Sequence, residues 1–119
     1  MVADVTVEGA PDDIVNGALS EFNRIDMLVN NAGVFVWKNL FELDYSDWSR
    51  TIDTNLGAPF HLTRIAGKTM ANQGTGGSII NIASIHGQVG DPNVVAHCAS
   101  KFGLVGLTKA SADALREHQ

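Results

Sequence analysis

Two short and mainly apolar runs are the clearest signal in the chain. One covers residues 25–29 and is closed by the polar segment 30–33, and the other covers residues 79–83 after the glycine-rich segment 74–77. Apolar runs of this length are typical of strands that are covered on both faces, as in a parallel sheet. We therefore predict two parallel strands at these positions.

A long helical pattern separates the two runs. Between residues 45 and 71 apolar side chains recur at helical spacing, and Ser46 is a suitable N-cap. Gly57 and Pro59 fall inside this segment, where they are expected to bend or split the helix. A helix that joins two parallel strands forms a crossover, and such crossovers are right-handed.

Two further helices are expected, one on either side of this strand–helix–strand unit. The first covers residues 11–22, where Pro11 suits the first helical position. The last covers residues 92–116, and its many Ala, Gly and Ser residues allow another helix to approach closely. The order helix–strand–helix–strand–helix predicts one α/β domain over residues 1–119.

Composition narrows the class of protein. The 119 residues are 45% hydrophobic and 18% charged, which excludes a disordered tail and a coiled coil. The net charge is −5 without any Lys/Arg run, so neither nucleic acid nor an acidic membrane surface is an expected partner. No apolar stretch reaches the roughly 18 residues of a membrane span. The single cysteine, Cys98, excludes an intramolecular disulfide and suits a cytoplasmic protein.

Four sequence patterns follow one another in a fixed order. They are the segment Asn30-Asn31-Ala32-Gly33, a helix asparagine at Asn55, Ser84 at the end of segment 77–84, and Lys101 within Ala99-Ser100-Lys101-Phe102-Gly103. This set resembles the short-chain dehydrogenase/reductase family over almost the whole chain. The resemblance implies a Rossmann-type doubly wound parallel sheet. It also implies hydride transfer between a nicotinamide cofactor, NAD or NADP, and a small alcohol or carbonyl substrate.

The resemblance assigns cofactor-binding roles to five residues of this chain. Asp4 matches the aspartate that contacts the adenine ring, and Lys101 matches the lysine that binds the nicotinamide ribose. Asn30, Ala32 and Gly33 match the loop that stabilises the sheet and lines the cofactor. A glycine in that loop allows the backbone to approach a ligand closely.

The same resemblance assigns catalytic roles. Asn55 matches the asparagine that holds a water in a proton relay, and Ser84 matches the serine that hydrogen-bonds the substrate oxygen. Lys101 also matches the residue that lowers the pKa of the catalytic acid. Ser84 follows a strand, and doubly wound sheets bind their ligands beyond the carboxyl ends of the strands. Positions 97 and 101 are four residues apart, which places them on one helix face.

Position 97 departs from the family pattern. The family has a tyrosine four residues before the lysine, and this chain has His97. The ordinary pKa of histidine is about 6.5, and a neighbouring lysine disfavours the protonated imidazole. Histidine is also shorter than tyrosine, and the only tyrosine, Tyr45, matches no catalytic position. We expect His97 to impair the usual chemistry and to leave at best weak, water-mediated proton transfer.

A second departure concerns the extent of the domain. The family orders its strands 3-2-1-4-5-6-7, and residues 1–119 match only the fourth and fifth, with the tail of the third at residues 1–3. The glycine-rich phosphate turn and the strands after the fifth have no counterpart in these residues. We therefore expect a partial Rossmann-type domain with bare sheet edges, which are a poor arrangement for two strands alone.

Other functions compete with oxidoreduction. A non-enzymatic remnant would associate with itself or with a full-length relative through the helices 45–71 and 92–116. A hydrolase triad built on Ser84 and His97 lacks the Gly-x-Ser-x-Gly elbow. The spacing of His86, Asp91, His97 and Cys98 fits no standard metal site, so none is predicted. The aromatic residues Phe35, Trp37 and Phe41 are expected to cover the helix–sheet seam, unless Phe35 and Trp37 edge a substrate pocket.

Overall fold

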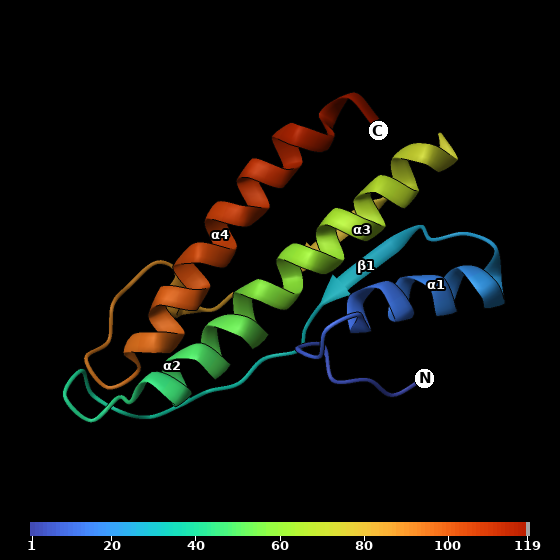
Figure 1. Cartoon of the computed structure of the whole chain (residues 1–119). Helices are drawn as coiled ribbons and strands as arrows, with labels where there is room; N and C mark the ends of the chain where they lie inside the picture. Colours follow the sequence, from blue (N-terminus) through green and yellow to red (C-terminus); the bar gives the residue numbers. More distant parts are fainter. Residues whose placement is uncertain (119) are drawn as a thin grey trace.

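Helices and strands alternate along the chain. A computed structural model describes residues 1–118 (Figure 1). In chain order its elements are helix α1 (Ala10–Phe22), strand β1 (Met27–Asn30), helix α2 (Tyr45–Ile52), the π-helical turn η1 (Asp53–Gly57), helix α3 (Ala58–Gln73), strand β2 (Ser78–Asn81), the 3-10 turn η2 (Ile85–Gly87), helix α4 (Val95–Leu115) and the 3-10 turn η3 (Arg116–His118).

The two predicted strands pair in parallel. Their register runs from Met27 opposite Ser78 to Asn30 opposite Asn81. Because the strands are parallel, both carboxyl ends lie at one edge of the sheet, and the segments after Asn30 and Asn81 leave from that edge. Residues 1–3, which match the tail of the family's third strand, were expected to lack a pairing partner; residues 1–4 have no regular structure, and no strand among the described residues pairs with them.

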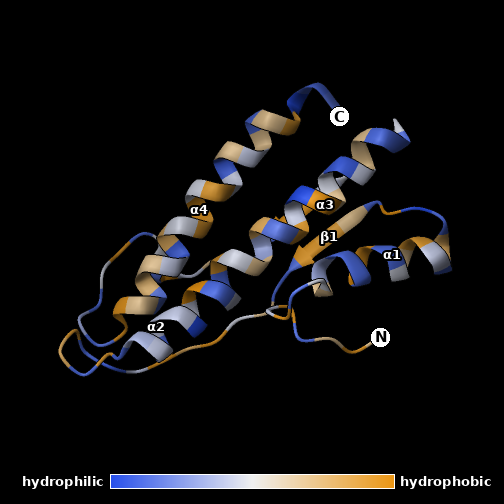
Figure 2. Ribbon diagram, in the orientation of Figure 1, coloured by the Kyte–Doolittle hydropathy of each residue, from blue (hydrophilic) through white to orange (hydrophobic). Residues whose placement is uncertain are grey.

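Helices pack on one face of this sheet. Val15 of α1 and Leu62 and Ala66 of α3 form the core, and Leu28 of β1 packs against them. Figure 1 shows α3 between α4 and α1, and Figure 2 shows that β1 is largely apolar. The strand side chains that point away from these helices are 42–59% exposed, so the described residues leave the other face open; these side chains are Met27, Val29 and Ile80.

The N-terminus of α2 differs from the prediction. Asp44, not Ser46, is the N-cap, and its side chain accepts a hydrogen bond from the Asp47 backbone N–H at 2.8 Å. The Asp44 carboxylate also pairs with Lys38 at 3.1 Å. Asp and Ser have similar capping ability. The ion pair with Lys38 favours Asp44, which lies two positions before Ser46.

The bend predicted at Gly57 and Pro59 corresponds to a single π-helical turn, and the helical path is not interrupted there. Residues Asp53–Gly57 form a π-helical turn, and Pro59 lies in the first turn of α3. The missing N–H of proline costs little at that position, so the helical path continues to Gln73. It ends at Gly74, whose φ of 67° is the left-handed conformation that glycine adopts readily.

Helix α4 begins at Val95, later than residue 92. Residues 91–94 form a turn in which the Asp91 carboxylate accepts from the Asn93 N–H at 2.8 Å. The predicted close helix packing is confirmed at Gly103, where a Cβ would lie 2.7 Å from the Leu56 side chain. Within residues 1–118, no helix combines the length and the apolar character needed to cross a membrane.

Candidate active site

Asn55 connects the loop after β1 to the helical layer. It lies in the π-helical turn η1 and is 1% exposed. Its amide oxygen accepts from the Val34 N–H at 2.8 Å, and its amide nitrogen donates to the Val34 carbonyl at 2.9 Å. Single π-helical turns inside α-helices are frequent at functional sites. The turn therefore presents one buried amide to both main-chain groups of a loop residue.

Ser100 joins Asn55 to His97. Its hydroxyl accepts from the Asn55 amide at 3.1 Å and donates to the His97 carbonyl at 2.8 Å. The Asn55 amide nitrogen also lies 3.5 Å from Nδ1 of His97. The sequence interpretation overlooked Ser100, which is fully buried. Its spacing of three residues from His97 on one helix face was the available signal.

His97 lies in a nearly closed environment. It is 8% exposed, and the edge of the Phe35 ring packs against it with centroids 4.9 Å apart. Burial lowers the pKa of His97, and the charges of Lys101 and His86 lower it further against an opposing hydrogen bond with the Val34 main chain. The imidazole is therefore neutral at neutral pH. The lysine effect was foreseen from the sequence, but burial is the larger cause.

Lys101 is fixed at the carboxyl edge of the sheet. Its ammonium donates to the Ile82 carbonyl at 2.7 Å, directly after β2, and the residue is 7% exposed. Burial lowers the pKa of Lys101, because desolvation disfavours the charged amine. The one hydrogen bond leaves two of the three ammonium donors for other partners.

Ser84 caps the 3-10 turn η2. Its hydroxyl accepts from the His86 N–H at 3.2 Å. The turn packs tightly on α4, since a Cβ at Gly87 would lie 3.0 Å from the Lys101 carbonyl. The structure thus brings the η2 turn that follows Ser84 against the stretch of α4 that carries His97 and Lys101.

The predicted cofactor residues divide into exposed and buried ones. Ala32, Gly33 and Asp4 are exposed, and Val5 lines a hollow of about 170 Å³ together with Ala32. The Asp4 carboxylate accepts from the Thr6 N–H and hydroxyl at 2.9 and 2.7 Å, and these hydrogen bonds lower the pKa of Asp4. These bonds both use Oδ1 of Asp4.

Asn30 faces the interior and belongs to the sheet. It is 6% exposed, and its amide donates to Thr63 at 3.3 Å and to Asn81 of the neighbouring strand at 2.8 Å. Asn81 in turn donates to Thr108 of α4 at 2.9 Å. Among the described residues Oδ1 of Asn30 has no partner. The side chain therefore connects β1 to β2 and α3, and Asn30 lines the same hollow as Ala32.

Sequence and structure comparisons decide the family. The family model described as short chain dehydrogenase matches residues 1–119. The chain belongs to the short-chain dehydrogenase family. A crystal structure of a short-chain type dehydrogenase/reductase from Mycobacterium marinum superposes with a TM-score of 0.95 at 32% identity, covering all of this chain and 49% of that one. The prediction of a partial Rossmann-type α/β fold is thereby confirmed.

Curated relatives in this family are oxidoreductases of greater length. The chain is 39% identical over 112 residues to a CLA biosynthesis dehydrogenase/reductase from Lactiplantibacillus plantarum, covering 94% of this chain and 39% of that protein. It is 43% identical over 112 residues to a D-threitol dehydrogenase from Mycolicibacterium smegmatis, covering 93% and 41%. The chain thus spans less than half the length of these short-chain dehydrogenases.

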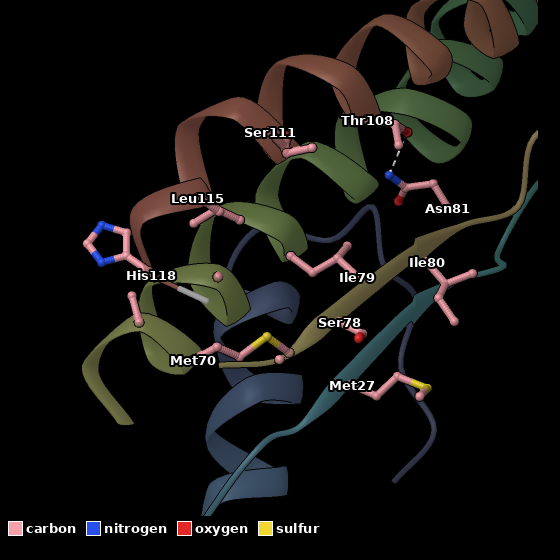
Figure 3. Close-up of a pocket in the computed structure, with 14 residues that line it drawn as sticks. Met27, Met70, Ser78, Ile79, Ile80, Asn81, Thr108, Ser111, Leu115 and His118 are labelled. Carbon is pink, nitrogen blue, oxygen red and sulfur yellow. Dashed lines mark hydrogen bonds between the residues drawn. The ribbon is translucent and has the colours of Figure 1, made fainter. Parts of the chain in front are cut away.

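A cavity of about 450 Å³ lies away from this cluster. Figure 3 shows it between α3, α4 and β2, with Met70, Ile79 and Leu115 among its walls. None of the site residues predicted for the short-chain dehydrogenase reaction lines it. The chemistry-bearing side chains are instead those of η1, η2 and the first half of α4.

Proposed function

We propose that the chain is the central part of an NAD(P)-dependent oxidoreductase, acting on a small alcohol or carbonyl compound. One observation carries the proposal: Asn55, His97 and Lys101 lie together beside the carboxyl edge of the sheet, where doubly wound folds bind ligands. The hydrogen bond from Lys101 to Ile82 fixes the ammonium at that edge.

The residues at this edge fit a nicotinamide dinucleotide. Asp4 offers an exposed carboxylate for the adenine end, and Ala32 and Gly33 offer an exposed loop. Lys101 has ammonium donors left for a ribose hydroxyl. When bound, this cofactor supplies or accepts the hydride. The cofactor-binding assignments follow the family pattern and stand as part of the proposal.

The chain's own residues act on the substrate oxygen and its proton. Ser84 donates a hydrogen bond to that oxygen, and Lys101 places a positive charge one helical turn from His97. The neutral imidazole of His97 accepts the hydroxyl proton in alcohol oxidation, because its lowered pKa leaves a ring nitrogen free at neutral pH. Histidine reaches less far than tyrosine, so proton transfer to or from the substrate is slow and passes through a water molecule.

Cofactor titration tests this function. We expect a saturable change in NADH or NADPH fluorescence when residues 1–119 are part of a complete domain that supplies the glycine-rich phosphate turn. Lys101→Gln should weaken binding by about 10- to 100-fold, since a hydrogen bond to a charged group contributes roughly 1.5–3 kcal/mol. Lys109→Gln, an exposed position on the same helix, is the matched control and should leave the affinity unchanged. No binding at millimolar cofactor would contradict the proposal for this chain.

A second candidate is a non-enzymatic chain that pairs with a second copy through its helices. Phe60 of α3 and Phe102 of α4 are 46% and 48% exposed, within the predicted segments 45–71 and 92–116. Aromatic side chains exposed on helices favour association. We expect sedimentation velocity to show a dimer that Phe102→Ser dissociates. A stable monomer at all concentrations would exclude this pairing, and saturable cofactor binding would exclude a purely non-enzymatic role.

A further inference from the structure

A second imidazole lies directly against His97. The rings of His86 and His97 have centroids 5.6 Å apart and stand at 85° to each other. Nε2 of His86 is 3.7 Å from a carboxylate oxygen of Asp91. The side chains of His86 and Asp91 are 20% and 30% exposed, whereas His97 is 8% exposed. The three groups therefore form a path from a buried imidazole to a carboxylate in contact with solvent.

Charge decides where a proton resides on this path. Lys101 of α4 and His86 of η2 are the titratable groups that face His97, and the other neighbours, Asn55, Val34 and Phe35, are uncharged. Two imidazolium ions and an ammonium this close together repel one another. Asp91 is the carboxylate beside His86, whereas at His97 burial outweighs the Val34 main-chain hydrogen bond that favours the charged ring. A proton on His97 is therefore passed on readily.

We propose that His86 and Asp91 form the proton relay of His97, in which at most one of the two imidazoles carries the transferred proton at a time. A proton taken up by His97 passes to neutral His86 and from there to water beside Asp91, and both imidazoles end neutral. The two rings are in edge-to-face contact, with centroids 5.6 Å apart, so no other side chain separates them. The relay rests on the proposed function for its purpose, because it serves the proton step at that site.

Histidine NMR of the whole chain tests the relay without any turnover. The chain has four histidines, at positions 61, 86, 97 and 118, so the ring nitrogens can be followed individually through a pH titration. We expect the His97 signal to show two steps, because it senses the charge of His86 as well as its own protonation. His86→Gln should raise the pKa of His97 and reduce the curve to a single step, since a like charge is removed.

Two further variants complete the design. Asp91→Asn should slow proton exchange between His97 and solvent, because the carboxylate at the solvent end of the path is removed. His61→Gln changes an exposed histidine on α3 and should leave the His97 titration unaltered. A single-step His97 curve in the unaltered chain, or a His86→Gln curve that superposes on it, would overturn the relay. Loss of cofactor binding would instead contradict the proposed function and leave this titration unchanged.

Discussion

Tyrosine at position 97 is expected to raise the rate of alcohol oxidation at least about 100-fold in a complete enzyme that carries this chain. A positioned general acid or base contributes roughly 10²–10⁴ to the rate. The buried imidazole of His97 faces Asn55 and Phe35 and is shorter than a phenol. A tyrosine on the same face of α4 would extend past these contacts to the substrate oxygen, with Lys101 one turn away to lower its pKa.

Two chimeras that differ only at this position provide the measurement. Residues 1–119 would replace the matching segment of the D-threitol dehydrogenase, which is 43% identical over 112 residues, with either His97 or His97→Tyr. Oxidation of D-threitol gives kcat for both, and cofactor affinity shows that both sites are intact. Ser84→Ala in the tyrosine chimera should cancel the gain. Equal kcat values in the two chimeras would show that His97 is an adequate substitute.

The histidine chimera should also differ in its pH dependence. Oxidation needs the neutral imidazole, so its residual rate is constant at neutral pH and falls only as the pH drops through the pKa of His97. Burial lowers that pKa, so the fall comes at more acidic pH than for an ordinary histidine. His97→Gln should remove both the residual rate and this acidic limb, which separates a proton-transfer role from simple packing.

The strands and the family were predictable because both depend on local sequence. The runs at residues 25–29 and 79–83 are mainly apolar, and they overlap the paired strands Met27–Asn30 and Ser78–Asn81. The motifs that carry Asn55 and Lys101 specify residue types at fixed spacing. Matching these patterns requires no knowledge of side-chain packing.

The details that escaped prediction are set by contacts between distant segments. Lys38 pairs with Asp44 and Asp47, and this favours Asp44 over Ser46 as the cap of α2. The proximity of His86 to His97 follows from the way η2 packs on α4 through Gly87, which the spacing of eleven residues alone does not reveal. The inward direction of Asn30 depends on Thr63 and Asn81, which lie far away in sequence.

Asn55→Ala is expected to reduce the free energy of unfolding by about 3 kcal/mol. The substitution leaves the Val34 N–H and carbonyl and the Ser100 hydroxyl without their partner, and each buried polar group left unpaired costs roughly 1–3 kcal/mol. Water that enters the vacated space pairs with some of these groups, so the expected loss lies at the lower end of the summed range. Urea denaturation of the whole chain measures the change. Asn72→Ala, at an exposed position near the end of α3, is the matched control and should change stability by less than about 0.5 kcal/mol.

A second variant separates the hydrogen bonds from the packing. Asn55→Asp keeps the shape and the acceptor for the Val34 N–H, but it places a carboxylate where the amide donated to the Val34 carbonyl. We expect it to destabilise the chain nearly as much as alanine, because the lost amide donors bind the Val34 carbonyl and the Ser100 hydroxyl. The loop that holds Ala32 and Gly33 is fixed to η1 through Val34, so both variants should weaken cofactor binding as well. Full stability in Asn55→Asp would show that packing in the π-helical turn, and not the amide, positions the loop.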